Sequence, residues 1–209
     1  LLELFTSQVA KVGMTDGIRQ VLQEESDALR AYYEQAGILI ARPAGGTSCR
    51  LAISAKGGTN AENHNHNDVG SYAVALGSET MVGDQGGPNS YPGDYFNGDA
   101  PQKYKIKGSF GHPVPVVDGR TQSSGGKAKG VVLQKEFTNE KDVFSIDYTS
   151  AYSTPNLDKL IRTFVYDRQG KGNFTVGDEF TAKTPIRFET AITTRADWKV
   201  LDDTHLLLA

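Results

Sequence analysis

A series of short β-type segments begins after Gly37 and limits the folds that this chain can adopt. They are rich in Val, Ile, Thr, Tyr and Phe, and turn-forming Gly, Pro, Asn and Asp separate them. The intervals lack the apolar spacing of a long helix, which argues against a parallel sheet built from β-α-β units. The pattern predicts an all-β fold of antiparallel strands, as a sandwich or a barrel. The predicted strands cover residues 38–41, 50–55, 71–76, 80–82, 114–117, 130–134, 143–148, 160–166, 173–176, 186–193 and 198–201.

The first 36 residues have a different pattern. Apolar residues from Leu2 to Tyr33 recur at helical spacing, and Asp16 and Gly37 are a candidate start and stop of the second helical stretch. We therefore expect a short helical segment over residues 1–36 and a β-domain over residues 37–209. The chain starts at Leu1, and its apolar run 206–209 has the pattern of an interrupted strand. These ends lead us to expect a fragment of a longer protein, with a C-terminally truncated β-domain.

Charge and cysteine content exclude several classes of protein. The 209 residues hold 22 Lys and Arg against 25 Asp and Glu, a net charge of -3. Neither nucleic-acid binding nor membrane binding follows from that balance, and we predict neither partner. Cys49 is the single cysteine, which excludes an intrachain disulfide and a multi-cysteine zinc site. Its position at the start of an apolar stretch predicts a small buried side chain.

Two of the four histidines lie in the sequence NHNHND at residues 63–68. In an extended segment, side chains two residues apart share a face, so His64, His66 and Asp68 are expected on one face. Two imidazoles at this spacing can bind one metal ion, or one can bind while the other acts as acid or base. The alternative interpretation is a polar surface loop with chance histidines.

A metal site needs further ligands from elsewhere in the chain. Asp84 follows a predicted strand, and His112 opens another. With His66 they would supply two imidazoles and one carboxylate, a set that suits zinc with a water molecule in the fourth position. As alternatives, Asp84 is an ordinary turn residue and His112 an ordinary strand-edge residue.

Lysines alternate with apolar and aromatic residues over residues 103–107. On a strand, Lys103, Lys105 and Lys107 would place three ammonium groups on one face. They could bind a polyanionic substrate, or they could protect an edge strand from aggregation.

Residues 83–98 are rich in Gly, Asn and Pro and predict a long ordered loop, a common place for function. Its aromatic residues Tyr91, Tyr95 and Phe96 could stack on sugar rings, and a tyrosine could donate a proton. Alternatively, these aromatic rings only pack the loop. Elsewhere, Trp198 is expected in the core, and His205 is expected to be an ordinary strand or surface residue.

Several motifs together carry a specific resemblance. They are NHNHND at residues 63–68, GSY at 70–72, GDQG at 83–86 and GHPVPVVDG at 111–119. The stretch YEQAGILIAR at residues 33–42 looks like the entry into the same domain. Over roughly residues 33–195, the chain resembles the C-terminal β-sandwich domain of the heparinase II/III-like polysaccharide lyases.

The resemblance implies an antiparallel β-sandwich that packs on an N-terminal α/α toroid domain, with the active cleft between the two. Residues 1–36 would then be the tail of that toroid or the linker from it. It further implies β-elimination on acidic polysaccharides such as heparin, heparan sulfate or alginate, in the periplasm or outside the cell. The principal catalytic tyrosine is expected in the toroid, so this chain is expected to be inactive alone.

With the lysines described above, the expected site residues are of three kinds. They are His64 and Tyr95 in catalysis, with Tyr91 as the alternative tyrosine; Asn63, Tyr91, Lys103 and Lys105 in substrate binding; and His66, Asp84 and His112 as ligands of a structural zinc ion.

Two other classes of function stay open at this point. In a cupin-like metalloenzyme His64 and His66 would both bind the metal, and Gly58 has the right spacing before His64. The glutamate that a cupin motif needs a few residues later is absent, since Gly70 and Ser71 stand there. The other class is a non-catalytic carbohydrate-binding β-sandwich.

Overall fold

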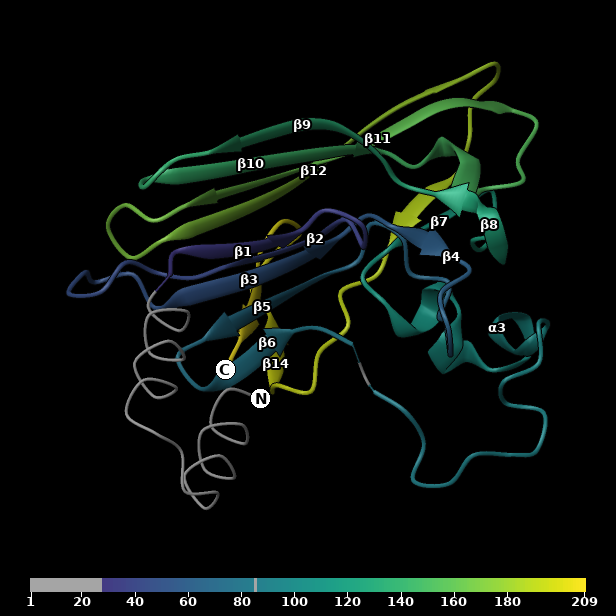
Figure 1. Ribbon diagram of the computed structural model, residues 1–209, viewed down its shortest axis with the longest axis horizontal. Helices are drawn as coiled ribbons and strands as arrows, with labels where there is room; N and C mark the ends of the chain where they lie inside the picture. Colours follow the sequence, from purple (N-terminus) through teal and green to yellow (C-terminus); the bar gives the residue numbers. More distant parts are fainter. Residues whose placement is uncertain (1–27, 85) are drawn as a thin grey trace.

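The computed structural model describes residues 28–84 and 86–209, so the helical prediction for residues 1–27 lies outside the described residues. Within that part of the chain, no helix is both long and apolar enough to cross a membrane. The backbone there is organised around two antiparallel sheets (Figure 1).

The larger sheet has five strands in the order β1-β2-β3-β5-β6. Side chains alternate between its two faces, which buries Leu39 and Ala41 of β2 together with Ile53 and Ala55 of β3. Its strands are β1 (Arg30–Tyr33), β2 (Ile38–Ala41), β3 (Leu51–Lys56), β5 (Tyr72–Leu76) and β6 (Glu79–Val82).

The second sheet has four strands in the order β12-β11-β10-β9. The same alternation buries Phe144 and Ile146 of β10 and Leu160 and Phe164 of β11. Its strands are β9 (Val131–Phe137), β10 (Lys141–Asp147), β11 (Leu157–Asp167) and β12 (Asn173–Ala182).

The two sheets lie face to face and share one hydrophobic core (Figure 1). The rings of Phe144 and Phe164 stack with centroids 6.0 Å apart, and Tyr72 of the larger sheet packs edge-on against Phe164 at 6.2 Å. Burial of these side chains is the main source of stability for such a sandwich. The predicted antiparallel β-sandwich is confirmed.

Short elements gather at one end of the sandwich (Figure 1). Two small sheets there pair β4 (Thr59–Asn60) with β8 (Gly125–Lys129) and β7 (Pro115–Val117) with β13 (Phe188–Thr190). The helical turns are α3 (Ala100–Lys103), η1 (Lys105–Lys107), η2 (Ser109–Gly111) and η3 (Thr149–Ala151). A separate hairpin pairs β14 (Trp198–Val200) with β15 (Leu206–Leu208).

All the predicted strands are present, with differences mainly at their ends, and β1, β4 and β8 are additional. The helical prediction for residues 28–36 is wrong, because Arg30–Tyr33 pairs with β2 across a turn that contains Gly37. The ring of Tyr32 explains the strand: it packs 5.7 Å from both Phe137 and Phe144 of the opposite sheet.

Two further expectations are wrong. Trp198 is 65% exposed, because its strand belongs to the outlying hairpin and not to either large sheet. The lysines at 103–107 lie in α3 and η1 instead of on a strand, so their side chains do not share one face. The predicted long loop at 83–98 is confirmed for its described residues, which contain neither a helix nor a strand.

Candidate functional site

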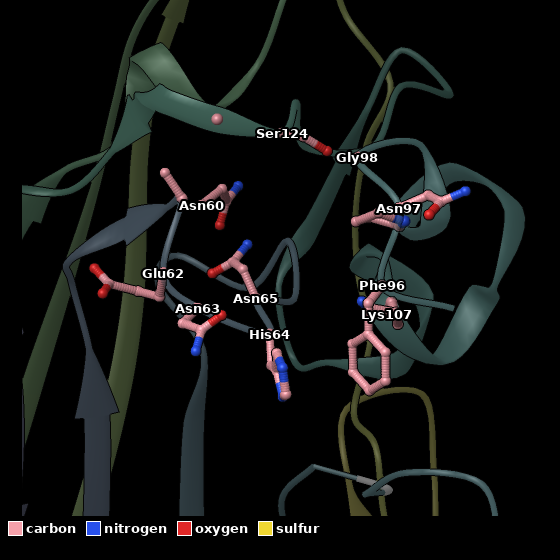
Figure 2. A pocket seen from close by; sticks show the side chains of 13 residues that line it. Asn60, Glu62, Asn63, His64, Asn65, Phe96, Asn97, Gly98, Lys107 and Ser124 are labelled. Carbon is pink, nitrogen blue, oxygen red and sulfur yellow. The ribbon is translucent and has the colours of Figure 1, made fainter. Parts of the chain in front are cut away.

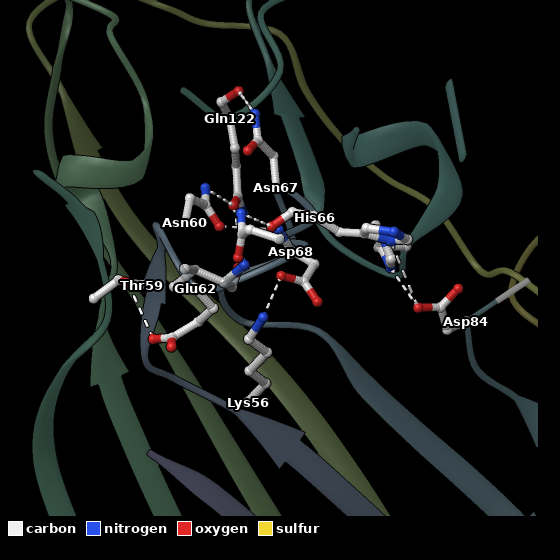
Figure 3. A network of polar contacts seen from close by, with 12 residues as sticks. Lys56, Thr59, Asn60, Glu62, His66, Asn67, Asp68, Asp84 and Gln122 are labelled. Atoms are coloured by element: carbon white, nitrogen blue, oxygen red, sulfur yellow. Dashed lines mark hydrogen bonds and ion pairs between the residues drawn. The ribbon is translucent and has the colours of Figure 1, made fainter. Parts of the chain in front are cut away.

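His66, Asp84 and His112 come from three separate connections and meet at one place. Figure 3 shows His66 and Asp84 at this place. One ligand atom of each residue lies within 4.8 Å of the other two. The ring nitrogens Nδ1 of His66 and Nε2 of His112 are 3.1 Å apart. The Asp84 carboxylate lies 3.5 Å from His112 and 4.0 Å from His66. Two imidazoles and one carboxylate at such separations are a donor set that can hold zinc.

Hydrogen bonds on both sides of Asp84 direct one of its oxygens toward the histidines. Before it, the Gly83 amide donates to the Thr193 carbonyl at 3.0 Å, and the Thr193 hydroxyl donates to the Gly83 carbonyl at 2.7 Å. After it, the Gly86 amide donates to Asp84 Oδ1 at 2.7 Å. Oδ2 therefore remains for the two imidazoles.

His112 is 1% exposed and follows the helical turn η2. The residue before it has no space for a side chain: a Cβ on Gly111 would overlap the carbonyl group of Ile106. This close backbone contact places His112 at the base of the site, where its ring also contacts His66.

A buried amide network determines the conformation of the loop that carries His66 (Figure 3). Gln122 Oε1 accepts from Asn60 Nδ2 at 2.9 Å and from the Val69 amide at 3.1 Å, while Gln122 Nε2 donates to the Val69 carbonyl at 2.7 Å. Asn67 Nδ2 donates to the Gln122 carbonyl at 2.9 Å. Because an unpaired buried amide is costly, this paired set favours one loop conformation.

Arg162 of β11 connects the segments that follow both histidines. It is 1% exposed, and its Nη1 donates to the carbonyls of Gly70 at 2.9 Å and Pro113 at 2.8 Å. Its other nitrogens bind the two carboxylate oxygens of Asp178 at 2.8 and 2.6 Å. A paired, fully hydrogen-bonded guanidinium of this kind holds its neighbours in fixed positions.

The electrostatic surroundings of His66 favour its neutral form. Burial lowers the pKa of His66, and the neighbouring His112 lowers it further, while Asp84 and Asp68 act in the opposite direction. Neutral imidazole is the form that binds a metal ion.

His64 does not lie with His66, so the expectation of one shared face is wrong. The backbone of His64 has a φ of +57°, in the left-handed region. The segment is therefore not extended at this residue, and side chains two residues apart do not share a face. The His64 ring packs instead against Phe96, with centroids 4.4 Å apart. Asp68 also leaves the predicted face and pairs with Lys56 at 2.5 Å.

The His64–Phe96 pair lines a pocket of about 550 Å³ (Figure 2). Asparagine side chains supply much of its polar wall, from Asn63 and Asn65 on one side to Asn97 on the other. The predicted substrate residue Asn63 is therefore at this pocket. A left-handed non-glycine residue at a pocket is backbone strain of the kind found at functional sites.

The three lysines of residues 103–107 have different surroundings. Lys107 is 2% exposed and lines the pocket. Lys103 is exposed and forms an ion pair with Asp94, and Lys105 is exposed with its ammonium 5.9 Å from the ring centroid of Phe110. Of the three lysines predicted to bind a polyanionic substrate, the structure therefore brings Lys107 to the pocket, and Lys103 and Lys105 are not in its lining.

The two predicted tyrosines lie in contact, with ring centroids 5.0 Å apart, but differ in exposure. Tyr91 is 58% exposed, whereas Tyr95 is 2% exposed. Burial raises the pKa of Tyr95, and its hydroxyl is buried without a hydrogen-bond partner among the described residues.

Sequence reasoning did not single out Arg162, Gln122 or Asn60. For Arg162 a signal exists, because it alternates with Leu160 and Phe164 and so occupies an inward position of an apolar strand. A charged residue at such a position must find buried partners. The roles of Gln122 and Asn60 depend on distant chain segments and leave no local pattern.

Comparison with known proteins gives a likeness of fold. The sequence matches no protein-family model and no curated protein. Among solved structures, the chain is similar to the heparan sulfate lyase HepC from Pedobacter heparinus, with a TM-score of 0.60 and 18% identity over 87% of this chain and 27% of the lyase. A mutant of the same lyase gives a TM-score of 0.58 and 19% identity over 76% and 23%. The chain thus spans about a quarter of the length of these lyases and shares the fold of that part.

Proposed function

We propose that this chain is the β-sandwich part of a polysaccharide lyase that cleaves uronic-acid-containing polysaccharides by β-elimination. The observation that carries the proposal is the position of His64, which lines the asparagine-rich pocket with a strained backbone. Two residues later, His66 belongs to the candidate metal cluster. The shared fold with a heparan sulfate lyase supports the same assignment.

The residues of the pocket suit the chemistry of β-elimination. A base removes the proton next to the uronate carboxylate, and the electron pair of that bond forms a carbon–carbon double bond to C4. The bond from C4 to its oxygen breaks, and an acid protonates the leaving oxygen. His64 is the candidate proton acceptor or charge-neutralising group, and such assistance typically contributes about 10²–10⁴-fold. The amides of Asn63, Asn65 and Asn97 are candidates to stabilise the negative charge that develops on the substrate.

We further propose that His66, Asp84 and His112 hold a structural zinc ion. Two nitrogens and one oxygen within 4.8 Å of one another are ligand types that zinc binds in proteins, and a water molecule would occupy the fourth position. When bound, zinc would connect three chain segments and so restrict the loop that presents His64. His64 itself stacks on Phe96 outside this cluster, which favours the lyase over a cupin, where both histidines would be ligands.

Tyr91 and Tyr95 are the candidate catalytic tyrosines of this chain. Tyr95 is buried and, unlike Lys107, does not line the pocket, so a polysaccharide could reach its hydroxyl only if the surrounding loop moved, whereas Tyr91 is exposed. Tyr95 stays a predicted catalytic residue on the basis of the resemblance, and the exposure of Tyr91 makes it the better-placed alternative. The principal catalytic tyrosine is assigned to an N-terminal toroid domain, which makes the chain alone inactive, and we place the protein in the periplasm or outside the cell.

The decisive experiment uses the full-length protein that contains this chain. Heparin, heparan sulfate, alginate and hyaluronan are supplied separately, and ultraviolet absorbance reports the unsaturated product. We expect product from at least one of these polymers. A folded protein that yields no product from any of them would exclude the lyase, and glycan binding without turnover would favour a carbohydrate-binding sandwich.

A further inference from the structure

Lys107 is a buried cation with few protein partners. Its side chain is 2% exposed and lines the pocket beside His64 and Phe96. Its ammonium donates one hydrogen bond, to the Tyr95 carbonyl at 2.8 Å. An ammonium group has three donors, so two of them have no hydrogen-bonding partner among the described residues.

Aromatic rings supply the rest of its surroundings. The Lys107 ammonium lies 4.7 Å from the ring centroid of Tyr95 and 5.2 Å from that of Phe96. Such contacts stabilise a cation only partly, and none of the ion pairs among the described residues includes Lys107. Burial accordingly lowers the pKa of Lys107. A buried charge without a counterion gains from an anion that enters the pocket.

The backbone of Lys107 also belongs to the site. The carbonyl of Lys107 accepts a hydrogen bond at 2.8 Å from the backbone N–H of Asn67, which belongs to the loop that carries His64 and His66. The pocket wall near it contains the side chains of Asn65 and Ser124, both of which can donate hydrogen bonds to oxygen.

We propose that Lys107 binds an anionic oxygen group, a carboxylate or a sulfate, of a sugar residue seated in this pocket. The inference rests on the proposed function and assigns to this residue the recognition of an acidic sugar next to His64. The two exposed lysines, Lys103 and Lys105, have no such role in it.

The test measures binding by chemical-shift titration of the ¹⁵N-labelled 209-residue chain. The probes are an unsulfated glucuronate-containing tetrasaccharide, its sulfated counterpart and a neutral tetrasaccharide of N-acetylglucosamine. Lys107→Met removes the charge with little change in volume, and Lys107→Gln keeps a donor for the Tyr95 carbonyl in case the Met variant does not fold. Lys171→Gln, at an exposed turn, is the matched control for loss of one positive charge.

We expect both Lys107 variants to bind the acidic tetrasaccharides about tenfold or more weakly, because they lose a charge-assisted hydrogen bond. Lys171→Gln should bind like the wild type, and the neutral probe should not distinguish the variants. Weakening with both acidic probes identifies a carboxylate as the bound group, and weakening with the sulfated probe alone identifies a sulfate.

Unchanged affinity in a folded Lys107 variant would overturn the assignment while leaving the lyase proposal intact. A wild-type chain that binds neither acidic probe would overturn it as well. In that case the ultraviolet assay on the full-length protein decides independently whether the proposed function stands.

Discussion

The guanidinium group of Arg162 donates a hydrogen bond to the carbonyl oxygen of Pro113 at 2.8 Å, directly after the candidate ligand His112. The same nitrogen donates to the carbonyl of Gly70, at the end of the loop that carries His66. One side chain of the four-stranded sheet thereby sets the separation of two segments that are distant in the sequence.

Replacing Arg162 with Met should destabilise the protein by about 3–5 kcal/mol, because Asp178 would be left as a poorly compensated carboxylate at a mostly buried position. The measurement is the free energy of unfolding in urea. Arg187→Met is the control, since Arg187 forms an exposed ion pair with Glu189 that should contribute less than about 1 kcal/mol. Equal effects of the two substitutions would contradict the role given to Arg162.

Zinc content should depend on His66 and His112 but not on His64. If the proposed site holds zinc, elemental analysis of purified protein should show loss of zinc in His66→Ala and His112→Ala, because each removes one of the three proposed protein ligands. His64→Ala should keep its zinc, since its ring packs on Phe96. A wild-type zinc content in His66→Ala would exclude the proposed zinc site. Loss of zinc in His64→Ala would favour the cupin interpretation.

The left-handed backbone at His64 leads to a test with two variants of the same residue. His64→Gly should be more stable than His64→Ala by about 1 kcal/mol, because relief of roughly 1–2 kcal/mol of steric cost at φ +57° exceeds the entropic cost of glycine. Both variants of the full-length protein should lose about 10²-fold or more in turnover. An alanine variant as stable as the glycine variant would show that the backbone strain is absent.

Gly111→Ala should destabilise the protein by about 1–3 kcal/mol, because the added methyl group would lie 2.8 Å from the carbonyl carbon of Ile106 and displace the turn before His112. Thermal unfolding measures the effect. Gly93→Ala is the matched control, since a Cβ there has open space around it. If the two variants unfold at the same temperature, the close contact at Gly111 is not a constraint on His112.

The strands of the sandwich could be predicted because their signals are local. Leu160 and Phe164 alternate with outward residues, and β-branched and aromatic residues fill the segments between turn-formers. The strand at Arg30–Tyr33 escaped prediction, because four residues after a helical pattern carry no separate signal. Its strand state depends on the packing of Tyr32 against the opposite sheet, which is a tertiary effect.

The candidate site, like the fold, was predictable only in part. Most strand segments, the near-neutral charge and the residue types of the candidate set of two histidines and one carboxylate follow from local sequence pattern and composition. That His64 and His66 face different surroundings depends on the folded backbone, because a left-handed dihedral angle at His64 breaks the alternation that a linear pattern assumes. The tertiary structure also decided that Lys107, and neither Lys103 nor Lys105, lies buried at the pocket. The exposure of a charged side chain and its ion pairs depend on which distant segments pack around it. The spacing of residues along the sequence does not contain that information.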